Sequence, residues 1–384
     1  MRSTALKLTS VLFFSCSLVA AVNAQEKLKV VTSAVPFLRI SPDARAGGMG
    51  DLGVATSPDA SAGFWNIGKV AFNESKGGIA ATYTPWLKNL VNDVYLASLS
   101  GYYKWDELQA INVGLRYFSL GNIQFTDQNG NINGNGKPRE FGIDVGYSRK
   151  LTDKFGLGVA LRYINSDLAS GAVSGGNTYK VGSSVAGDIG VYYNGKDDAG
   201  NGFTFGGTLT NLGAKISYTD NADQKDFIPA NFGLGFTWNK SFDEQNKITL
   251  GADFNKLLVP TFTGDPSDPL ALEAYRKKGV PGSWASSFSD FPGQANVSLG
   301  AEYWYNNQFA FRAGYFFEDK SRGNRRYFTA GLGLKYNIFG LNFSYLAPSG
   351  SGVTQNPLSN TLRFSVLFDL DGGSGESTSD SNNE

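Results

Sequence analysis

Residues 43–68 have the sequence DARAGGMGDLGVATSPDASAGFWNIG and lie ahead of every segment that is recognisable as a β-strand. The stretch is rich in Gly, Ala, Ser and Asp, does not alternate between apolar and polar residues, and includes the aromatic pair Phe64 and Trp65 near its end. About fourteen amphipathic strands follow it, which is enough to close into a cylinder whose interior must be filled or hydrated. We therefore expect residues 43–68 to fill the lumen of a β-barrel.

An ordinary surface linker is the alternative for this stretch. Linkers seldom end in Phe-Trp-Asn, and they seldom carry a cluster of charges such as Asp43, Arg45 and Asp51 beside small residues that permit close backbone packing. These features favour a packed segment over a linker.

The strands are recognised by strict alternation of side-chain character. From Ile111 to Phe118, large apolar residues take every second position, and Asn, Gly and Arg occupy most of the others. The pattern recurs at 156–163, 232–239 and 328–336. A period of two with one apolar face and one small or polar face is typical of the strands of a transmembrane barrel.

A soluble β-sandwich would show the same period, and the lengths of the connections separate the two. Connections after even-numbered strands are short, whereas those after odd-numbered strands are long, up to residues 258–293. Tight turns at one rim and long loops at the other are typical of outer-membrane barrels and place both termini in the periplasm. The expected strands are residues 77–84, 93–104, 109–119, 140–150, 155–166, 183–194, 202–212, 229–240, 246–257, 294–305, 308–318, 326–336, 340–347 and 361–370.

Aromatic residues gather near the ends of these strands, as expected of side chains at the two membrane interfaces. A soluble core would place them nearer the middle of the strands. One rim would carry Trp105, Tyr147, Tyr193, Trp238, Trp304 and Tyr336, and the other Tyr83, Tyr117, Tyr163, Phe254, Tyr315 and Tyr345.

Residues 1–24 have the pattern of a secretory signal peptide, with basic Arg2 and Lys7, an apolar run, and a small-residue cleavage site ending at Ala24. The only cysteine, Cys16, would leave with the signal; a lipoprotein signal is disfavoured because apolar sequence continues beyond it. We expect an N-terminal segment and lumen plug at 25–76, a transmembrane β-barrel at 77–370 and a disordered acidic tail at 371–384.

Composition argues against several classes of function. Without the signal the chain has 32 basic and 34 acidic residues, so no electrostatic case for nucleic-acid binding exists. The chain has no histidine, which removes Ser-His catalysis and the commonest metal ligand. We expect a non-enzyme with no catalytic residue, no cofactor and no metal.

Charged residues at the inward positions of the expected strands are interpreted as lumen charges that pair with one another or with the plug. A catalytic carboxylate is the alternative, but no motif places a nucleophile beside one. The predicted lumen charges are Arg116, Asp144, Arg162, Asp188, Asp253, Glu302, Arg312, Lys335 and Arg363.

The long loops are the expected sites of recognition. The longest contains an amphipathic stretch from Leu270 to Lys278, which predicts a short helix capped by Ser267 or Asp268. A loop that only seals its own barrel is the alternative, and the Asn- and Gly-rich residues 128–136 are expected to be flexible. The partner-binding candidates are Trp86, Leu87, Leu90, Leu270, Leu272, Tyr275, Trp284 and Phe288.

The run DARAGGMGDLGVA at 43–55, followed by FWNIG at 64–68, resembles the N-terminal signature of the FadL-like superfamily of outer-membrane barrels. Within it, the chain most resembles the PorV family of the type IX secretion system. The wider superfamily usually has Asn-Pro-Ala where this chain has Asn-Ile-Gly from Asn66. The resemblance is carried by Asp43, Ala44, Arg45, Ala46, Met49, Gly50, Asp51, Trp65 and Asn66.

This resemblance implies an interaction protein in the outer membrane of a Gram-negative bacterium. It would sit in the lipid bilayer beside the translocon barrel, bind the C-terminal signal domains of secreted cargo, and deliver the cargo to the cell-surface sortase or attachment complex. A FadL-like transporter of hydrophobic small molecules is the alternative. Transport needs an apolar pocket, whereas the expected inward positions are mostly small, polar or charged, which favours docking.

Overall fold

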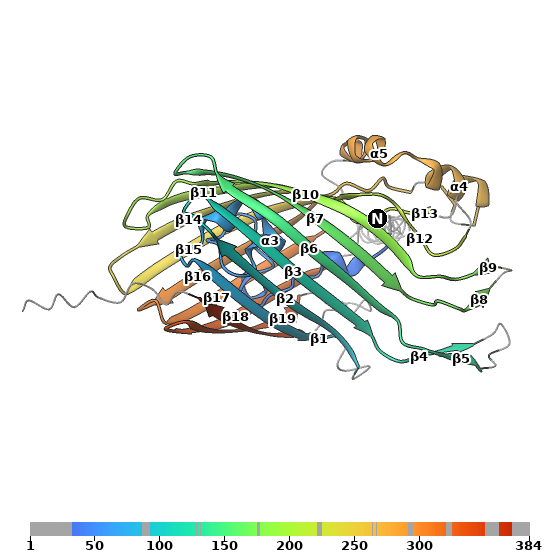
Figure 1. The fold of residues 1–384 in the computed structure, drawn as a ribbon, viewed down its shortest axis with the longest axis horizontal. Coiled ribbons are helices and arrows are strands. Elements are labelled where there is room, and N and C mark those ends of the chain that lie inside the picture. The colour runs from blue at the N-terminus through green and yellow to red at the C-terminus, as the bar shows by residue number, and fades with distance from the viewer. Residues whose placement is uncertain are drawn as a thin grey trace, which may run out of the picture.

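In the computed structural model, residues 33–86, 93–126, 130, 132–174, 177–220, 225–262, 264–265, 267–290, 295–319, 325–349 and 361–370 are described. Fourteen antiparallel strands close into a barrel in which β1 pairs with β20 (Figure 1). This confirms the predicted fold class, and every strand boundary lies within two residues of its expected position. In barrel order the strands are β1 (Gly77–Pro85), β2 (Val94–Lys104), β3 (Gln109–Leu120), β6 (Arg139–Lys150), β7 (Phe155–Asp167), β10 (Gly182–Asn194), β11 (Gly202–Gly213), β14 (Asn231–Ser241), β15 (Asn246–Leu257), β16 (Ala295–Tyr305), β17 (Phe309–Glu318), β18 (Arg326–Tyr336), β19 (Phe339–Pro348) and β20 (Thr361–Asp369).

The two faces of the barrel wall differ in chemistry. On β7, Leu157, Val159 and Leu161 are exposed on the outside, whereas Ala160 and Arg162 are buried inside. An outer surface of exposed apolar side chains is unfavourable in water and favourable in lipid. Among the described residues, no helix is long and apolar enough to cross a membrane.

The two rims of the barrel carry different connections. Short turns join β2 to β3, β6 to β7, β10 to β11, β14 to β15, β16 to β17, and β18 to β19. Asn306, Asn307 and Asn337 adopt the left-handed conformation in two of these turns, with φ of 53°, 51° and 52°. Asparagine tolerates this conformation better than most residues do, which accounts for asparagine at these turns.

The long-loop rim carries elements that alternation did not predict. Three small hairpins rise from it: β4 (Ile123–Thr126) with β5 (Ile132–Gly136), β8 (Val173–Ser174) with β9 (Asn177–Thr178), and β12 (Ile216–Ser217) with β13 (Lys225–Asp226). The segment 128–136, expected to be flexible, contributes β5. The longest loop forms α4 (Pro269–Lys277), α5 (Val280–Ser286) and η3 (Ser287–Asp290); the side chain of Asp268 caps α4, as predicted.

Residues 33–76, which precede β1, lie inside the barrel (Figure 1). They contain η1 (Pro36–Arg39), α2 (Ala44–Gly48), α3 (Ala62–Trp65) and η2 (Ile67–Phe72). Helix α2 packs against β17 to β20, and η2 packs against β6, β7 and β10 on the opposite wall. We call residues 33–76 the plug segment.

The plug segment runs from one rim to the other. Its Ala34 amide donates a hydrogen bond of 2.9 Å to the carbonyl of Phe227 at the long-loop rim, whereas β20 ends at Asp369 beside Gly78 at the short-turn rim. Both ends of the chain lie outside the described residues, so the periplasmic location of the two termini stays a prediction. An even strand count fixes only where β1 begins and β20 ends, and the plug segment crosses the lumen before β1.

Candidate functional site

A row of buried ion pairs lines one wall of the lumen. Arg162 on β7 pairs with Asp144 on β6 and, at 2.8 Å between Nη2 and Oδ2, with Asp188 on β10. Arg116 on β3 extends the row to Asp144 at 3.6 Å and donates a hydrogen bond to the carbonyl of Leu38 in the plug segment. The four charges neutralise one another across four adjacent strands.

A second cluster joins the plug segment to the opposite wall. Arg45 on α2 donates two hydrogen bonds to Glu302 on β16, at 2.9 and 2.8 Å, and Arg312 on β17 donates a third at 2.6 Å. Arg45 also pairs with Asp59 at 3.1 Å. Burial alone would lower the pKa of Arg45, but the carboxylates of Glu302 and Asp59 raise it above its ordinary value. The guanidinium of Arg45 therefore stays charged inside the lumen.

Asp43, Arg45 and Asp51 do not form one cluster, because each has different partners. Asp43 caps α2 through the amide of Ala46 at 2.8 Å and accepts a 2.6 Å hydrogen bond from Trp65 Nε1. Asp51 is held by two residues of the wall: Arg363 at 3.0 Å and the Tyr327 hydroxyl at 2.6 Å. The sequence placed these residues in one segment but could not show which wall strand each one meets.

Other signature residues shape the turns of the plug segment. The Asn66 amide group donates to the carbonyls of Val54 and Val191 at 3.0 and 2.9 Å, and its oxygen accepts from the amide of Gly68. Asp253 on β15 accepts from the amides of Gly53 and Val54 at 2.7 and 2.8 Å. These hydrogen bonds join the plug backbone to β10 and β15.

Lys69 is the fully buried cation of the plug segment. Its Nζ donates to the carbonyls of Gly53 and Thr56 and to the Thr56 hydroxyl, at 2.6, 3.2 and 3.0 Å. Burial lowers the pKa of Lys69 to about 8, against the partly opposing charge of Asp59. Lys69 is therefore the plug residue whose charge is most sensitive to mildly alkaline pH.

This lowered pKa predicts that stability rises with pH. The ordinary lysine pKa is about 10.4, so between about pH 8 and 10 the unfolded chain holds a proton on Lys69 that the folded chain has lost. We expect the free energy of unfolding of the wild type to increase relative to Lys69→Met when the pH is raised from 7.5 to 10. Denaturant titrations at the two pH values measure this difference, and equal pH slopes would contradict it.

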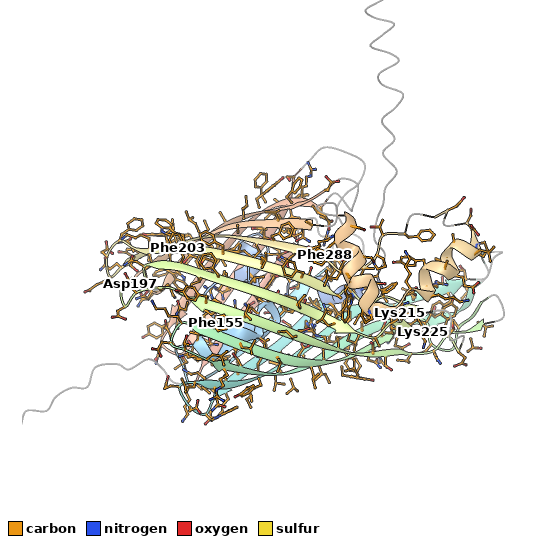
Figure 2. The ribbon with its side chains drawn as sticks, turned by 90° about the horizontal axis from the view of Figure 1, so that it is seen from above. Phe155, Asp197, Phe203, Lys215, Lys225 and Phe288 are labelled. Carbon is orange, nitrogen blue, oxygen red and sulfur yellow. The ribbon has the colours of Figure 1, made fainter. Side chains whose placement is uncertain are left out.

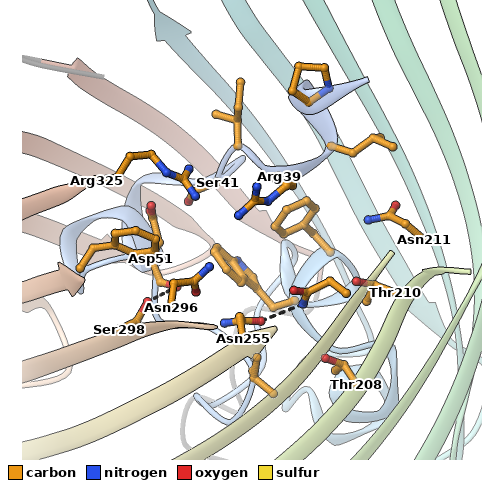
Figure 3. Close-up of a pocket in the computed structure, with 18 of the residues that line it drawn as sticks. Arg39, Ser41, Asp51, Thr208, Thr210, Asn211, Asn255, Asn296, Ser298 and Arg325 are labelled. Carbon is orange, nitrogen blue, oxygen red and sulfur yellow. Dashed lines mark hydrogen bonds between the residues drawn. The ribbon is translucent and has the colours of Figure 1, made fainter. Parts of the chain in front are cut away.

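The described part of the barrel includes the following two cavities. One, of about 250 Å3, lies toward the long-loop rim between the plug segment and the wall (Figure 3). Its lining combines the apolar side chains Leu38, Phe64 and Trp86 with amides and arginines. The other, of about 630 Å3, lies at the short-turn rim and is lined mainly by polar and charged residues.

The predicted lumen charges are not all in one environment. Arg116, Asp144, Arg162, Asp188, Asp253, Glu302, Arg312 and Arg363 are buried. Lys335 is different, because about half of its side chain is exposed in the short-turn cavity, where it pairs with Asp369 at 2.8 Å. Among the described residues, no cluster of acidic, cysteine or histidine side chains could hold a metal ion.

The loop candidates fall into two groups. Tyr275 is buried against Phe227 and Phe262, and its hydroxyl donates to the carbonyl of Pro260, so it anchors the loop. Trp86 packs on Phe118 and lines the long-loop cavity, so it is not the exposed docking residue that was expected.

The second group remains accessible. Leu270 is 75 % exposed, Phe288 is exposed, and Leu272 and Trp284 are half-buried. Figure 2 shows the helices of this loop lying over the long-loop end of the barrel. Leu87 and Leu90 lie outside the described residues. We call residues 258–290 the arm.

These features define an outer-membrane β-barrel of the FadL-like type. The Ralstonia pickettii toluene transporter TbuX has a similar structure, with a TM-score of 0.54 at 12 % identity over 85 % of this chain and 97 % of that chain. The Pseudomonas putida toluene transporter TodX matches with 0.51 at 12 %, over 89 % and 98 %. A Pseudomonas aeruginosa FadL homologue matches with 0.50 at 12 %, over 86 % and 99 %. At these identities the likeness shows the fold alone.

Sequence comparison identifies the family. The family model described as type IX secretion system protein PorV matches residues 22–264. The chain belongs to the PorV family. No curated protein sequence matches it significantly.

Proposed function

We propose that this protein is an outer-membrane carrier of the type IX secretion system. It binds secreted cargo through the cargo's C-terminal signal domain at the translocon and passes it to the cell-surface attachment complex. Membership of the PorV family is the observation that carries the proposal. Residues 1–24 act as the signal peptide, and the long-loop rim faces the outside of the cell.

The surface of the arm supports a docking role. Leu270 points away from the anchoring residue Tyr275 on the same helix and leaves a large apolar side chain in solvent. Exposed apolar residues on a loop of a rigid scaffold are common at protein interaction sites. Most of the lumen charges, by contrast, are used in ion pairs that join wall strands to one another or to the plug segment, which supports a non-enzymatic role.

The second candidate is a FadL-like transporter of hydrophobic small molecules. The long-loop cavity favours it, because aromatic and aliphatic side chains form part of its wall, and TbuX and TodX are described as toluene transporters. Beyond this cavity the plug segment crosses the lumen and is held to β16 and β20 by ion pairs, Arg45–Glu302 and Asp51–Arg363. A transport path would have to displace these contacts, so we favour the carrier.

Copurification separates the two candidates. The protein extracted from its own membrane in mild detergent should bring down a large translocon barrel or cargo C-terminal domains. Recovery of bound hydrophobic molecules without protein partners would support the transporter instead.

A change on the arm tests the docking surface. We expect Leu270→Glu to leave the barrel folded, because this side chain lies 75 % exposed on α4, and to reduce secreted cargo at least severalfold by placing a charge in an apolar contact. Deletion of residues 265–288 should have a larger effect in the same direction. Immunoblots of cargo in the medium give the result, and the heat-dependent gel mobility of the barrel controls for folding. Unchanged secretion in both variants would exclude the arm as the docking site.

A further inference from the structure

Two buried hydrogen-bond donors on residues that line the long-loop cavity have no acceptor among the described residues. Trp86 Nε1 is buried and has no hydrogen-bond partner in the described part of the chain. Arg363 also lines the cavity, and its Nε is likewise buried without a hydrogen-bond partner among the described residues. Buried donors without acceptors are unfavourable, so these two groups favour a ligand that supplies oxygen acceptors.

Two arginines of the cavity share one carboxylate. Arg325 donates a hydrogen bond of 2.7 Å to each carboxylate oxygen of Glu318. Arg39 reaches the same carboxylate only at 3.5 Å, and no other acidic group pairs with Arg39 among the described residues. Figure 3 shows the guanidinium groups of Arg39 and Arg325 directed toward one another in the cavity.

Among the described residues, Glu318 is the one carboxylate that pairs with Arg39 and Arg325, which leaves an excess of one positive charge in this group. Burial and the nearby Arg325 together lower the pKa of Arg39 to about 10, which still leaves it charged at neutral pH. About a quarter of each arginine side chain remains exposed, so a solute can reach them. A second carboxylate between the two guanidiniums would balance the charge and accept their free N–H groups.

The rest of the cavity indicates what carries that carboxylate. Neighbouring strands present Thr210, Asn231, Asn255 and Asn296 to the cavity, and Asn231 donates to Asn255 at 2.9 Å. Amides and hydroxyls in a row suit the alternating N–H and C=O groups of an extended peptide. An alkyl chain would leave them unsatisfied.

We propose that the cavity binds the free carboxyl terminus of a peptide chain entering from the long-loop rim. The terminal carboxylate lies between Arg39 and Arg325, the apolar wall at Leu38 and Phe316 receives a side chain, and the amide row pairs with the main chain. A volume of about 250 Å3 is below that of pockets for drug-sized ligands, so only the end of the chain enters. The inference rests on the proposed carrier function, since it names the part of a cargo protein that this site recognises.

The test uses the purified full-length barrel in detergent and a fluorescein-labelled hexapeptide, GSGAVL, as free acid and as carboxamide. Fluorescence anisotropy should show the acid binding at least tenfold more tightly than the amide, as expected for hydrogen bonds to a charged group. In Arg39→Gln this preference should fall to about twofold or less. Arg139→Gln is the matched control, because Arg139 is an exposed arginine of the same rim that pairs with Asp167 outside the cavity.

A variant that is expected to bind the acid peptide more tightly controls for misfolding as the cause of weak binding. Glu318→Gln removes the competing carboxylate and should tighten binding of the acid peptide severalfold, which a damaged protein would not do. Equal binding of acid and amide, or binding of octanoate without binding of the acid peptide, would overturn the proposal. If the peptide binds but neither translocon nor cargo copurifies, the carrier function fails and the peptide site stands. If the partners copurify but the peptide shows no carboxylate preference, the peptide site fails and the carrier function stands.

Discussion

Replacing Glu302 with glutamine is expected to cost about 3–5 kcal/mol of unfolding free energy, the usual cost of removing one member of a buried ion cluster. Glu302 is 2 % exposed and is the shared acceptor of Arg45 and Arg312. Without its charge, the guanidiniums of Arg45 and Arg312 lose their shared carboxylate, and among the described residues Asp59 is the one remaining ion-pair partner of Arg45. Because Arg45 belongs to α2 and Glu302 to β16, the same change weakens one of the contacts that hold the plug segment to the wall.

Denaturant titration of the purified barrel measures this effect. Glu107→Gln is the matched control, because Glu107 is almost fully exposed in its pair with Lys104 and should contribute less than about 1 kcal/mol. In the double variant Arg45→Gln/Glu302→Gln, one of the two cations that lose the Glu302 carboxylate is also removed. Part of the lost unfolding free energy should therefore be recovered, since the effects of substitutions within one cluster are not additive. A loss below about 1 kcal/mol for Glu302→Gln would show that the cluster does not hold the fold.

The strands and the inward charges were predictable because a lipid environment imposes alternation on every barrel strand. The pairings along the wall also follow from strand register: Arg162 lies directly opposite Asp144 and diagonally, two positions along β10, from Asp188, and Glu302 lies opposite Arg312. A chain whose register is set by short turns therefore shows part of its lumen chemistry in its sequence.

The contacts of the plug segment could not be predicted in this way. Arg45 meets Glu302 across 257 positions of sequence, and Arg363 meets Asp51 across 312. No periodicity links such residues, because their contact depends on the path of an irregular segment through the lumen. The hairpins of the long-loop rim were missed for another reason, since strands of two residues, such as β8 and β12, are too short to show alternation.

Gly314→Ala is expected to displace the turn of the plug segment at Met49 and Gly50. A Cβ at Gly314 on β17 would lie 2.1 Å from the carbonyl carbon of Met49 and 2.2 Å from the amide nitrogen of Gly50. Backbone atoms cannot rotate out of the way as a flexible side chain can. The turn at Met49 and Gly50 must therefore move away from β17. Overpacking of this kind costs about 1–3 kcal/mol, and here the cost falls on the contact between plug and barrel.

Cysteine labelling detects this displacement, because Cys16 is the only natural cysteine and belongs to the expected signal peptide. Ala55, a plug residue with no exposed surface, is replaced by cysteine in both backgrounds. The rate of maleimide labelling should rise about tenfold or more with Gly314→Ala, since each 1.4 kcal/mol of local destabilisation changes the open population tenfold.

The matched control is Gly187→Ala on β10, where an added Cβ would meet only ordinary contacts at 3.7 and 4.0 Å. It should leave the labelling rate unchanged. Because β17 pairs with β16 and β18 through its backbone, the barrel of the Gly314 variant should keep its heat-dependent gel mobility while the plug loosens. Slow labelling in a folded Gly314→Ala barrel would mean that the wall yields instead of the plug, and that the plug segment is the more rigid of the two.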